Sequence, residues 1–400
     1  MVQPALQKSL ADRVPLNRNG EAIHFEVGEF WTALQRQASS LHEISYRACF
    51  KPQLPRFFIE RFSNPGDLIY DPFMGRGTTV IEAALLGRMV VGNDANPLGT
   101  ILTKPRLSIP EIQQVQERLE SISLAAAPSF SPKLAMFYHP KTEAEITALR
   151  DYLGNRKREG REDAIDEWIR MVATNRLTGH SKGFFSVYTL PPNQAASARR
   201  QIKINEKLRQ KPEYRSVKDL TLRKTKSLLR SVTEEQRTIL AFAGERALFL
   251  CNQAWDTPEI KSNSVQLTVT SPPFLDIVNY VEDNWLRCWF NDIEPRHVAQ
   301  RITMSRSLEQ WSESMSAVFR ELYRVTQPRG FVAFEVGEIR RKSIRLEDIV
   351  IPIGENAGFT CQAVFINTQR FTKTANIWGI KNNESGTNSN RIVLFQKEHR

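Results

Sequence analysis

The stretch from Gly66 to Pro97, GDLIYDPFMGRGTTVIEAALLGRMVVGNDANP, constrains the fold of this chain more than any other part of the sequence. Its first apolar run is typical of a buried strand, the run that ends at Gly87 is typical of a helix, and a second strand-like run follows at once. Two strands joined through a helix are the repeating unit of a parallel sheet. The stretch therefore predicts an α/β protein.

The second half of the chain continues this pattern. Its strand-like runs are ERALFLCN, VQLTVTSPPF, GFVAFEVGE, FTCQAVFINTQ and NRIVLFQK, and amphipathic stretches such as SLEQWSESMSAVFRELYRV separate several of them. Such alternation predicts a doubly wound sheet with crossover helices. The last two runs flank the polar loop NNESGTNSN, which predicts a C-terminal β-hairpin.

Residues 105–243 separate the second predicted strand from the third. They have mostly helical patterns, as in TEAEITALRDYL, EDAIDEWIRMV and YRSVKDLTLRKTKSLLRSV. A strand-to-strand return needs far fewer residues, so we interpret this region as an inserted domain. The predicted organisation is a first half of the sheet domain over residues 1–104, the insertion, and the second half over residues 244–400.

The excess positive charge is concentrated within the insertion. Residues 171–230 contain fourteen Lys or Arg against three Asp or Glu, a net charge of +11, which equals the net charge of the whole chain. A neutral body with one basic segment suits a polyanion such as nucleic acid. The alternative is an ordinary solvated helical face. The residues that we predict to contact DNA are Arg199, Arg200, Lys203, Arg223, Lys224 and Lys226.

A cofactor site is predicted where the first two strands end. DPFMGRGTT places Gly75 and Gly77 after a strand that ends in Asp71, and glycine lets the backbone approach a ligand closely. The second strand ends in Asp94, where a carboxylate can accept both hydroxyls of a ribose. The alternative is a structural turn and a surface acid. The motifs G-x-G-x-x-G and G-x-x-x-x-G-K-[ST] are absent, so a cofactor without phosphates, S-adenosylmethionine, is predicted.

Two motifs together resemble those of the DNA amino-methyltransferases, which modify the exocyclic nitrogen of cytosine or adenine. DPFMGRGTT is similar to the F-x-G-x-G cofactor motif, and TSPPF is similar to the [DNS]-P-P-[YFW] catalytic motif. The resemblance implies a Rossmann-like methyltransferase sheet over about 40–105 and 243–397. The cofactor-binding residues that it implies are Asp71, Phe73, Gly75, Gly77, Thr78, Thr79, Asp94 and Asn252.

The catalytic residues implied by the resemblance are Ser271, Pro272, Pro273 and Phe274. In the family this turn receives a base rotated out of the duplex. The Ser271 hydroxyl and the Pro272 carbonyl would accept the N–H bonds of the amino group, and Phe274 would stack on the base. Taken alone, two prolines after a strand are an ordinary strand terminator.

Serine before Pro-Pro is commonest in the cytosine-N4 members of the family. The prediction is therefore methyl transfer to N4 of cytosine in duplex DNA, with adenine-N6 methylation as the alternative. An RNA base methyltransferase and a non-catalytic DNA-binding module are further alternatives. A separate cognate restriction endonuclease is a possible partner. The motif order suggests that the insertion recognises the target sequence, although it enters one strand earlier than the family pattern.

Other classes of protein are disfavoured by the sequence. The four cysteines form no C-x-x-C pair and the six histidines show no ligand spacing, so neither a metal site nor a disulfide framework is expected. No apolar run reaches the length of about eighteen residues needed to span a membrane, and the first residues lack a signal-peptide core. A cytoplasmic protein is expected.

Overall fold

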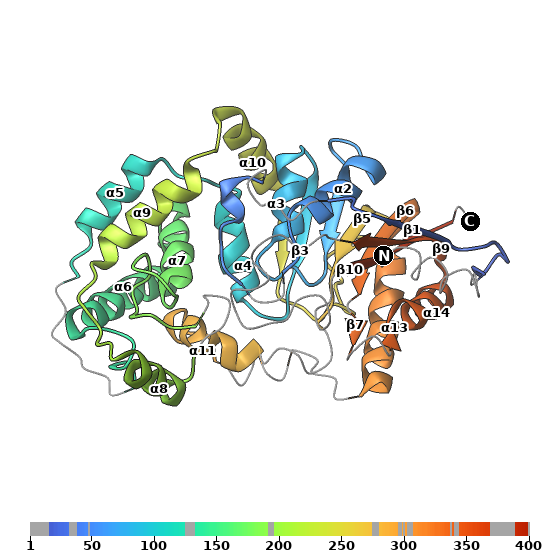
Figure 1. The fold of residues 1–400 in the computed structure, drawn as a ribbon. Helices are drawn as coiled ribbons and strands as arrows, with labels where there is room; N and C mark the ends of the chain where they lie inside the picture. Colours follow the sequence, from blue (N-terminus) through green and yellow to red (C-terminus); the bar gives the residue numbers. More distant parts are fainter. Residues whose placement is uncertain are drawn as a thin grey trace.

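The computed structural model shows a β-sheet with helices on both of its faces at one side, and a region built of helices at the other side (Figure 1). Its described residues are 16–31, 38–46, 49–124, 133–190, 196–273, 280–294, 298, 301, 307–336, 338–339, 344–368 and 389–398.

In this part of the chain, eight strands form one sheet. They are β1 (His24–Gly28), β2 (Leu68–Asp71), β3 (Met89–Asn93), β4 (Leu248–Leu250), β5 (Val265–Thr270), β6 (Thr326–Val336), β9 (Thr360–Thr368) and β10 (Ser389–Gln396). The spatial order is β1-β9-β10-β6-β5-β2-β3-β4. All neighbours are parallel except β10, which runs antiparallel to β9 and β6. The order reverses between β2 and β5, so the predicted doubly wound sheet is confirmed.

The side chains of each strand alternate between two apolar clusters. In β2, Ile69 packs in one cluster and Tyr70 in the other, and Ile392 and Val393 of β10 divide in the same way. One face is covered by α2 (Gln53–Phe62), α3 (Thr78–Leu85) and α10 (Glu234–Arg246). The opposite face is covered by α13 (Leu308–Val325) and α14 (Glu347–Ala357).

The helical region confirms the helices predicted from the patterns of the insertion. It contains α5 (Ile112–Ser121), α6 (Pro140–Arg158), α7 (Ala164–Arg176), α8 (Ala198–Leu208) and α9 (Val217–Leu229). The short elements η2 (Ser40–His42), α4 (Leu98–Thr103) and η3 (Lys104–Arg106) and the later helix α11 (Tyr280–Phe290) lie against it. Helix α7 is central, since it contacts α4, α5, α9 and α11.

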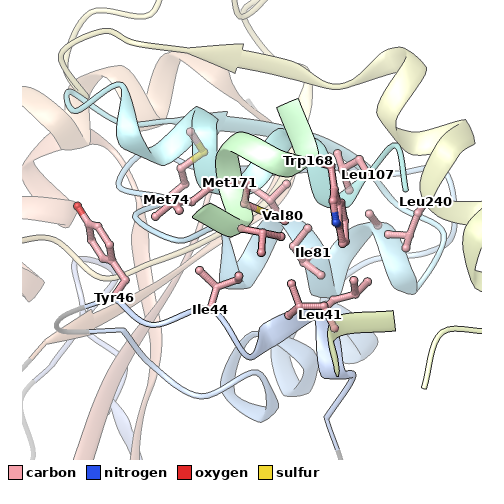
Figure 2. Packing of buried hydrophobic residues seen from close by; sticks show 14 of the residues in the cluster. Leu41, Ile44, Tyr46, Met74, Val80, Ile81, Leu107, Trp168, Met171 and Leu240 are labelled. Atoms are coloured by element: carbon pink, nitrogen blue, oxygen red, sulfur yellow. The ribbon is translucent and has the colours of Figure 1, made fainter. Parts of the chain in front are cut away.

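The helical region and the sheet share one apolar core. Figure 2 shows Trp168 and Met171 of α7 in the same cluster as Val80 and Ile81 of α3. Helix α10, at the end of the predicted insertion, packs against α3 and β3 as a crossover helix does. The boundaries predicted at residues 105 and 243 stay a prediction.

The strands differ from the sequence predictions in two places. Strand β1 was not predicted, because only Phe25 and Val27 pack against the sheet, and so short an alternation does not distinguish a strand from a loop. Strand β6 begins at Thr326, four residues before Gly330. The predicted hairpin is confirmed by the antiparallel pairing of β9 with β10.

Candidate cofactor and active site

The loop between β2 and α3 folds onto the end of β3. The Gly75 amide donates to Oδ2 of Asp94 at 2.8 Å, and the Asn96 amide donates to Oδ1 of the same carboxylate at 2.8 Å. Gly75 has a φ of +51°, a conformation that residues with a β-carbon rarely adopt. The predicted glycine motif and the predicted ribose acid are therefore in direct contact.

Asp94 keeps hydrogen-bonding capacity for a ligand. An ionised carboxylate offers about four acceptor sites, and the two backbone amides occupy two of them. Burial raises the pKa of Asp94 to about 6, against the hydrogen bonds from Asn96 and Gly75, which lower it. At neutral pH the group is therefore mostly ionised and able to accept two hydroxyls.

Asp71 connects β2 to β5. Its Oδ1 accepts hydrogen bonds from the Thr270 hydroxyl at 2.6 Å and from the Phe73 amide at 3.2 Å. Burial raises the pKa of Asp71 to about 7, although these hydrogen bonds oppose the rise. The hydroxyl of Thr79, in α3, donates to the Val269 carbonyl at 3.0 Å. Thr79 thus joins helix α3 to β5.

Gly77 has a packing role. Its φ is +74°, and an added β-carbon would lie 2.3 Å from the side chain of Thr103. Gly77 does not line the cavity beside the loop. The sequence prediction attributed this glycine to cofactor approach, whereas the structure explains it by the close contact with α4.

A mostly apolar cavity opens at this edge of the sheet. Five predicted cofactor residues line it, namely Asp71, Phe73, Gly75, Thr78 and Asp94. Other lining residues were missed by sequence reasoning, among them Tyr46, Phe50, Gln253, Ala254, Trp255 and Arg301. They come from segments distant in the sequence, and no motif marks them.

The end of β5 brings the predicted catalytic motif to the same cavity. Ser271 and Pro273 line the cavity, and Pro272 between them is buried. The Trp311 indole N–H donates to the Pro273 carbonyl at 3.1 Å, so helix α13 holds the carbonyl of the second proline. Phe274, the predicted stacking residue, lies outside the described residues.

Glu335, near the end of β6, is a buried acid that sequence reasoning missed. The side chains of Ser271 and Asn390 hydrogen-bond its carboxyl group. Burial raises the pKa of Glu335 to about 7, and the two hydrogen bonds oppose that rise. An acid within the apolar run FVAFEV was the available signal, because a buried charge needs a partner.

Asn252 is not among the residues that line the cavity. Its side-chain amide donates to Oε2 of Glu259 at 2.9 Å, and the next residues, 253–255, line the cavity instead. Asn93 holds this region together, since its amide nitrogen donates to the Pro72 carbonyl at 3.2 Å and to the Asn252 carbonyl at 3.1 Å. Asn252 is thus tied to Asn93 through its backbone, while its side chain bonds Glu259.

The residues predicted to contact DNA lie on two helices. Arg199, Arg200 and Lys203 are exposed on α8, and Arg223 and Lys226 are exposed on α9.

Lys224, the remaining predicted DNA contact, is buried. Only 9% of this residue is exposed, and its Nζ lies 3.7 Å from Oε2 of Glu43. Burial lowers the pKa of Lys224 to about 8, and the nearby guanidinium of Arg176 adds to this effect. Its side chain belongs to the contact between α9 and the segment after η2, so it is not presented to a phosphate.

The cavity suits a nucleoside cofactor. Asp94 retains acceptor sites for ribose hydroxyls, the turn at Gly75 leaves space for close approach, and Phe73 and Trp255 offer apolar surface to a flat ring. Among the residues that the structure describes, no three His, Cys, Asp or Glu side chains are grouped to hold a metal ion. None of the helices in those residues combines the length and apolarity needed to cross a membrane.

The strand order, the glycine loop and the acid after the second strand define an α/β protein of the Rossmann-like methyltransferase type. A family model described as DNA methylase, for N6 and N4 methyltransferases, matches residues 7–98.

Proteins of similar sequence are described as type II methyltransferases. Type II methyltransferase M.MjaII of Methanocaldococcus jannaschii is 36% identical over 74 residues, which cover 18% of this chain and 14% of that protein. Type II methyltransferase M.BsoBI of Geobacillus stearothermophilus is 21% identical over 278 residues, which cover 65% of this chain and 54% of that protein. The chain thus spans about half the length, or less, of these relatives.

A solved SAM-dependent methyltransferase from Methanosarcina mazei is 10% identical, with a TM-score of 0.32, and covers 86% of this chain and 98% of that chain. The fold assignment rests on the strand order instead. The family match over residues 7–98 and the curated relatives support the predicted resemblance of this chain to the DNA amino-methyltransferases. The cofactor of that family is S-adenosylmethionine, as predicted for this chain.

Proposed function

We propose that this protein is a DNA methyltransferase that transfers a methyl group from S-adenosylmethionine to N4 of cytosine in duplex DNA. The observation that carries the proposal is the meeting of Ser271 with Asp94 and Gly75 at one cavity. These residues come from the ends of β5 and β3 and from the loop after β2. Such a meeting at the carboxyl edge of a parallel sheet is where this fold class binds ligands.

The cofactor would be held by the loop after β2 and by the end of β3. Asp94 would accept the ribose hydroxyls while it keeps its bonds to the Gly75 and Asn96 amides. Phe73 and Trp255 would contact the adenine ring through their apolar faces. When bound, S-adenosylmethionine supplies a methyl group on a positively charged sulfur.

Ser271 and Pro272 would bind the amino group of a base rotated out of the duplex. That amine is a poor nucleophile because its lone pair is delocalised into the ring. Two oxygens that accept its N–H bonds draw the lone pair back onto nitrogen. Helix α13 already occupies the Pro273 carbonyl, which agrees with the Pro272 carbonyl as the second acceptor. These acceptors are fixed in advance, as electrostatic catalysis requires.

Glu335 acts in this proposal as a positioning residue. The Ser271 hydroxyl donates to its carboxylate, which directs the lone pairs of that hydroxyl to the base. The amino nitrogen loses one proton during methylation, and a carboxylate with a pKa near 7 is a suitable acceptor one hydrogen bond behind Ser271.

Adenine-N6 methylation is the second candidate, and Glu335 is the observation that favours it. Adenine-specific members of the family mostly carry aspartate where this chain has Ser271. The carboxyl group of Glu335, which hydrogen-bonds Ser271, would place a negative charge beside the Ser271 and Pro272 acceptors, as that aspartate does.

The test is product identification. Duplex DNA of varied sequence is incubated with the protein and S-adenosylmethionine, digested to nucleosides and separated by mass spectrometry. N4-methylcytosine is the expected product. N6-methyladenine alone would assign the enzyme to the second candidate. No methylated base in DNA, together with methylation of an RNA substrate, would overturn the substrate class.

A further inference from the structure

Helix α8 buries very little of itself. Gln201 is its only buried residue, while Ile202 is 44% exposed and Leu208 is 49% exposed. Single exposed apolar side chains are ordinary on protein surfaces. Here two of them occur on a helix whose apolar contact with the core is limited to the partly buried Ala198 and Ile204, so most of its apolar surface remains exposed to solvent.

Hydrogen bonds hold α8 against the rest of the protein. The Ser197 hydroxyl caps its first turn by accepting from the Arg200 amide at 3.2 Å. The Gln201 side chain donates to the Tyr188 carbonyl at 3.0 Å, and the Asn205 side chain donates to the Met136 carbonyl at 2.7 Å. Gln201 and Asn205 are four residues apart and therefore share one face. That face is turned to the protein, and the opposite face is turned to solvent.

The solvent face of α8 is a stripe of cations. Arg199, Lys203 and Lys207 follow one another at four-residue intervals, and Arg200 adjoins them. All four residues are exposed, and within the described residues their side chains have no hydrogen-bond or ion-pair partner. Their charge is therefore fully available to a polyanion.

Two other side chains share this outward surface. Ile202 and Glu206 are exposed, lie four residues apart, and border the cationic stripe on one side. In a DNA groove, an apolar side chain contacts the methyl group of thymine, and a glutamate accepts from the amino group of cytosine. The helix thus pairs phosphate-binding side chains with side chains able to distinguish bases.

Helix α8 also adjoins the chain that leaves the catalytic motif. The Trp285 indole N–H donates to the carbonyl of Ala196, just before α8, at 3.3 Å. Trp285 lies in α11, which begins at Tyr280, seven residues after Pro273. Figure 1 shows α8 and α11 at the same lower margin of the helical region.

We propose that α8 is the helix that enters the major groove of duplex DNA. Arg199, Lys203 and Lys207 bind phosphates, while Ile202 and Glu206 contact base edges. The major groove admits an α-helix, and eleven residues span about 16 Å at 1.5 Å per residue. This inference rests on the proposed function, because it takes duplex DNA as the substrate.

The first experiment compares two double variants that remove equal charge. Arg199→Gln with Lys203→Gln changes α8, and Arg223→Gln with Lys226→Gln changes exposed positions of α9. Binding of a labelled duplex of mixed sequence is measured by fluorescence anisotropy over a range of salt concentrations. The α8 pair should weaken binding about tenfold or more and reduce the slope of log K against log salt by roughly 1.8, for two lost phosphate contacts. The α9 pair should change that slope by less than about 0.5, because this proposal assigns the phosphate contacts to α8 and not to Arg223 and Lys226, which the sequence also predicted as DNA contacts.

Equal changes in the two pairs would mean that net charge alone attracts DNA, and a larger change in the α9 pair would assign the contact to α9. Either result overturns the inference. Cofactor affinity and the thermal midpoint are measured for both pairs, because an unfolded variant would lose all binding. If the wild type neither binds nor methylates duplex DNA, the proposed function fails as well. If it methylates DNA and the α8 pair binds normally, only this inference fails.

The second experiment tests base contact. Genomic DNA is treated with the wild type, with Glu206→Gln or with Ile202→Ala, and the positions of methylated bases are determined by sequencing. The wild type should mark one sequence motif, and each variant should accept additional bases at one position of that motif. An unchanged motif in both variants would mean that α8 touches only the backbone, or single-stranded DNA, and would overturn its placement in the groove.

Discussion

The carboxyl edge of the sheet and helix α8 both carry several polar and charged side chains. These side chains are buried and hydrogen-bonded at the edge, whereas they are exposed on α8. At the edge, Asp71, Asp94 and Glu335 are held by hydrogen bonds from neighbouring strands and loops, and burial raises the pKa of each. On α8, exposed cations such as Arg199 and Lys203 have no partner among the described residues.

This difference separates two kinds of interaction. Groups at the edge act over one hydrogen-bond length, and their effects are nearly independent of salt because little water lies between them. Cations on α8 act through a field that salt screens within about 10 Å at 0.1 M. Variants at the edge should therefore change chemistry or cofactor binding, and variants on α8 should change the salt dependence of DNA binding.

The largest expected effect is that of Ser271→Ala. Removal of one preorganised hydrogen-bonding group typically lowers kcat by about 10²–10³-fold, and we expect a loss of that size. Cofactor affinity measured by calorimetry should be retained, and the loss should be the same at low and high salt. Ser314→Ala, on the solvent side of α13, is the matched control and should retain full activity. A loss of rate that disappears at low salt would contradict the expectation that variants at the sheet edge act independently of salt.

Asp94→Ala should weaken cofactor binding by roughly 10–100-fold, since hydrogen bonds to a charged group contribute about 1.5–3 kcal/mol. The variant also frees the Gly75 amide, which now donates to Asp94. Asp67→Ala is the control, because Asp67 precedes the opposite end of β2 and its carboxylate accepts from the Asn64 amide. Titration calorimetry with S-adenosylmethionine measures both variants, and equal affinities would remove Asp94 from the cofactor site.

The pH dependence of activity should report Glu335. If the ionised carboxylate is the active form, kcat falls up to about tenfold per pH unit below about 7. The contribution of Glu335 to stability has the opposite sign, because a raised carboxyl pKa means that the folded protein binds the proton more tightly. That contribution is lost as pH rises from 4.5 to about 7.

Glu335→Gln is the variant for this test. It should flatten the acid limb of the rate profile while the glutamine still accepts a hydrogen bond from Ser271. An acid limb that persists near pH 7 in this variant would assign the titration to another group.

The smallest expected effect is that of Lys224→Met, which sharpens the contrast between buried and exposed lysines. Glu43 keeps its partner Arg230, so no buried charge is left alone, and the free energy of unfolding should change by less than about 1 kcal/mol. Salt dependence of DNA binding should be unaltered. Chemical denaturation and anisotropy measure the two quantities. A reduced salt slope would show that Lys224 reaches DNA despite its burial.

Much of the fold was predictable from local patterns. Strands β2, β3 and β5 are apolar runs with clear ends, and helix α13 has an unbroken amphipathic period, so each was located from sequence alone. Strand β1 was missed because its pairing partner, β9, lies more than 300 residues away in the sequence. A short edge strand is defined by that partner rather than by its own residues.

The candidate site was predictable where a motif combines a backbone requirement with a functional group. Gly75, Asp94 and Ser271 were found in this way, and all three meet at the cavity. Glu335 and Trp255 were not found, because neither belongs to a motif and each reaches the site only after the sheet forms. Lys224 and Arg223 are adjacent in the sequence and both carry cationic side chains, yet Lys224 is buried and Arg223 is exposed.

The sequence by itself thus determined the class of fold, the glycine loop, the acid after the second strand and the position of the Ser-Pro-Pro turn. These features depend on residues within one strand and the following turn, where local geometry decides the outcome. Only the tertiary structure decided which charges are free. Whether a lysine faces solvent or Glu43 depends on how α9 packs on η2, and such packing joins residues that are far apart in the sequence.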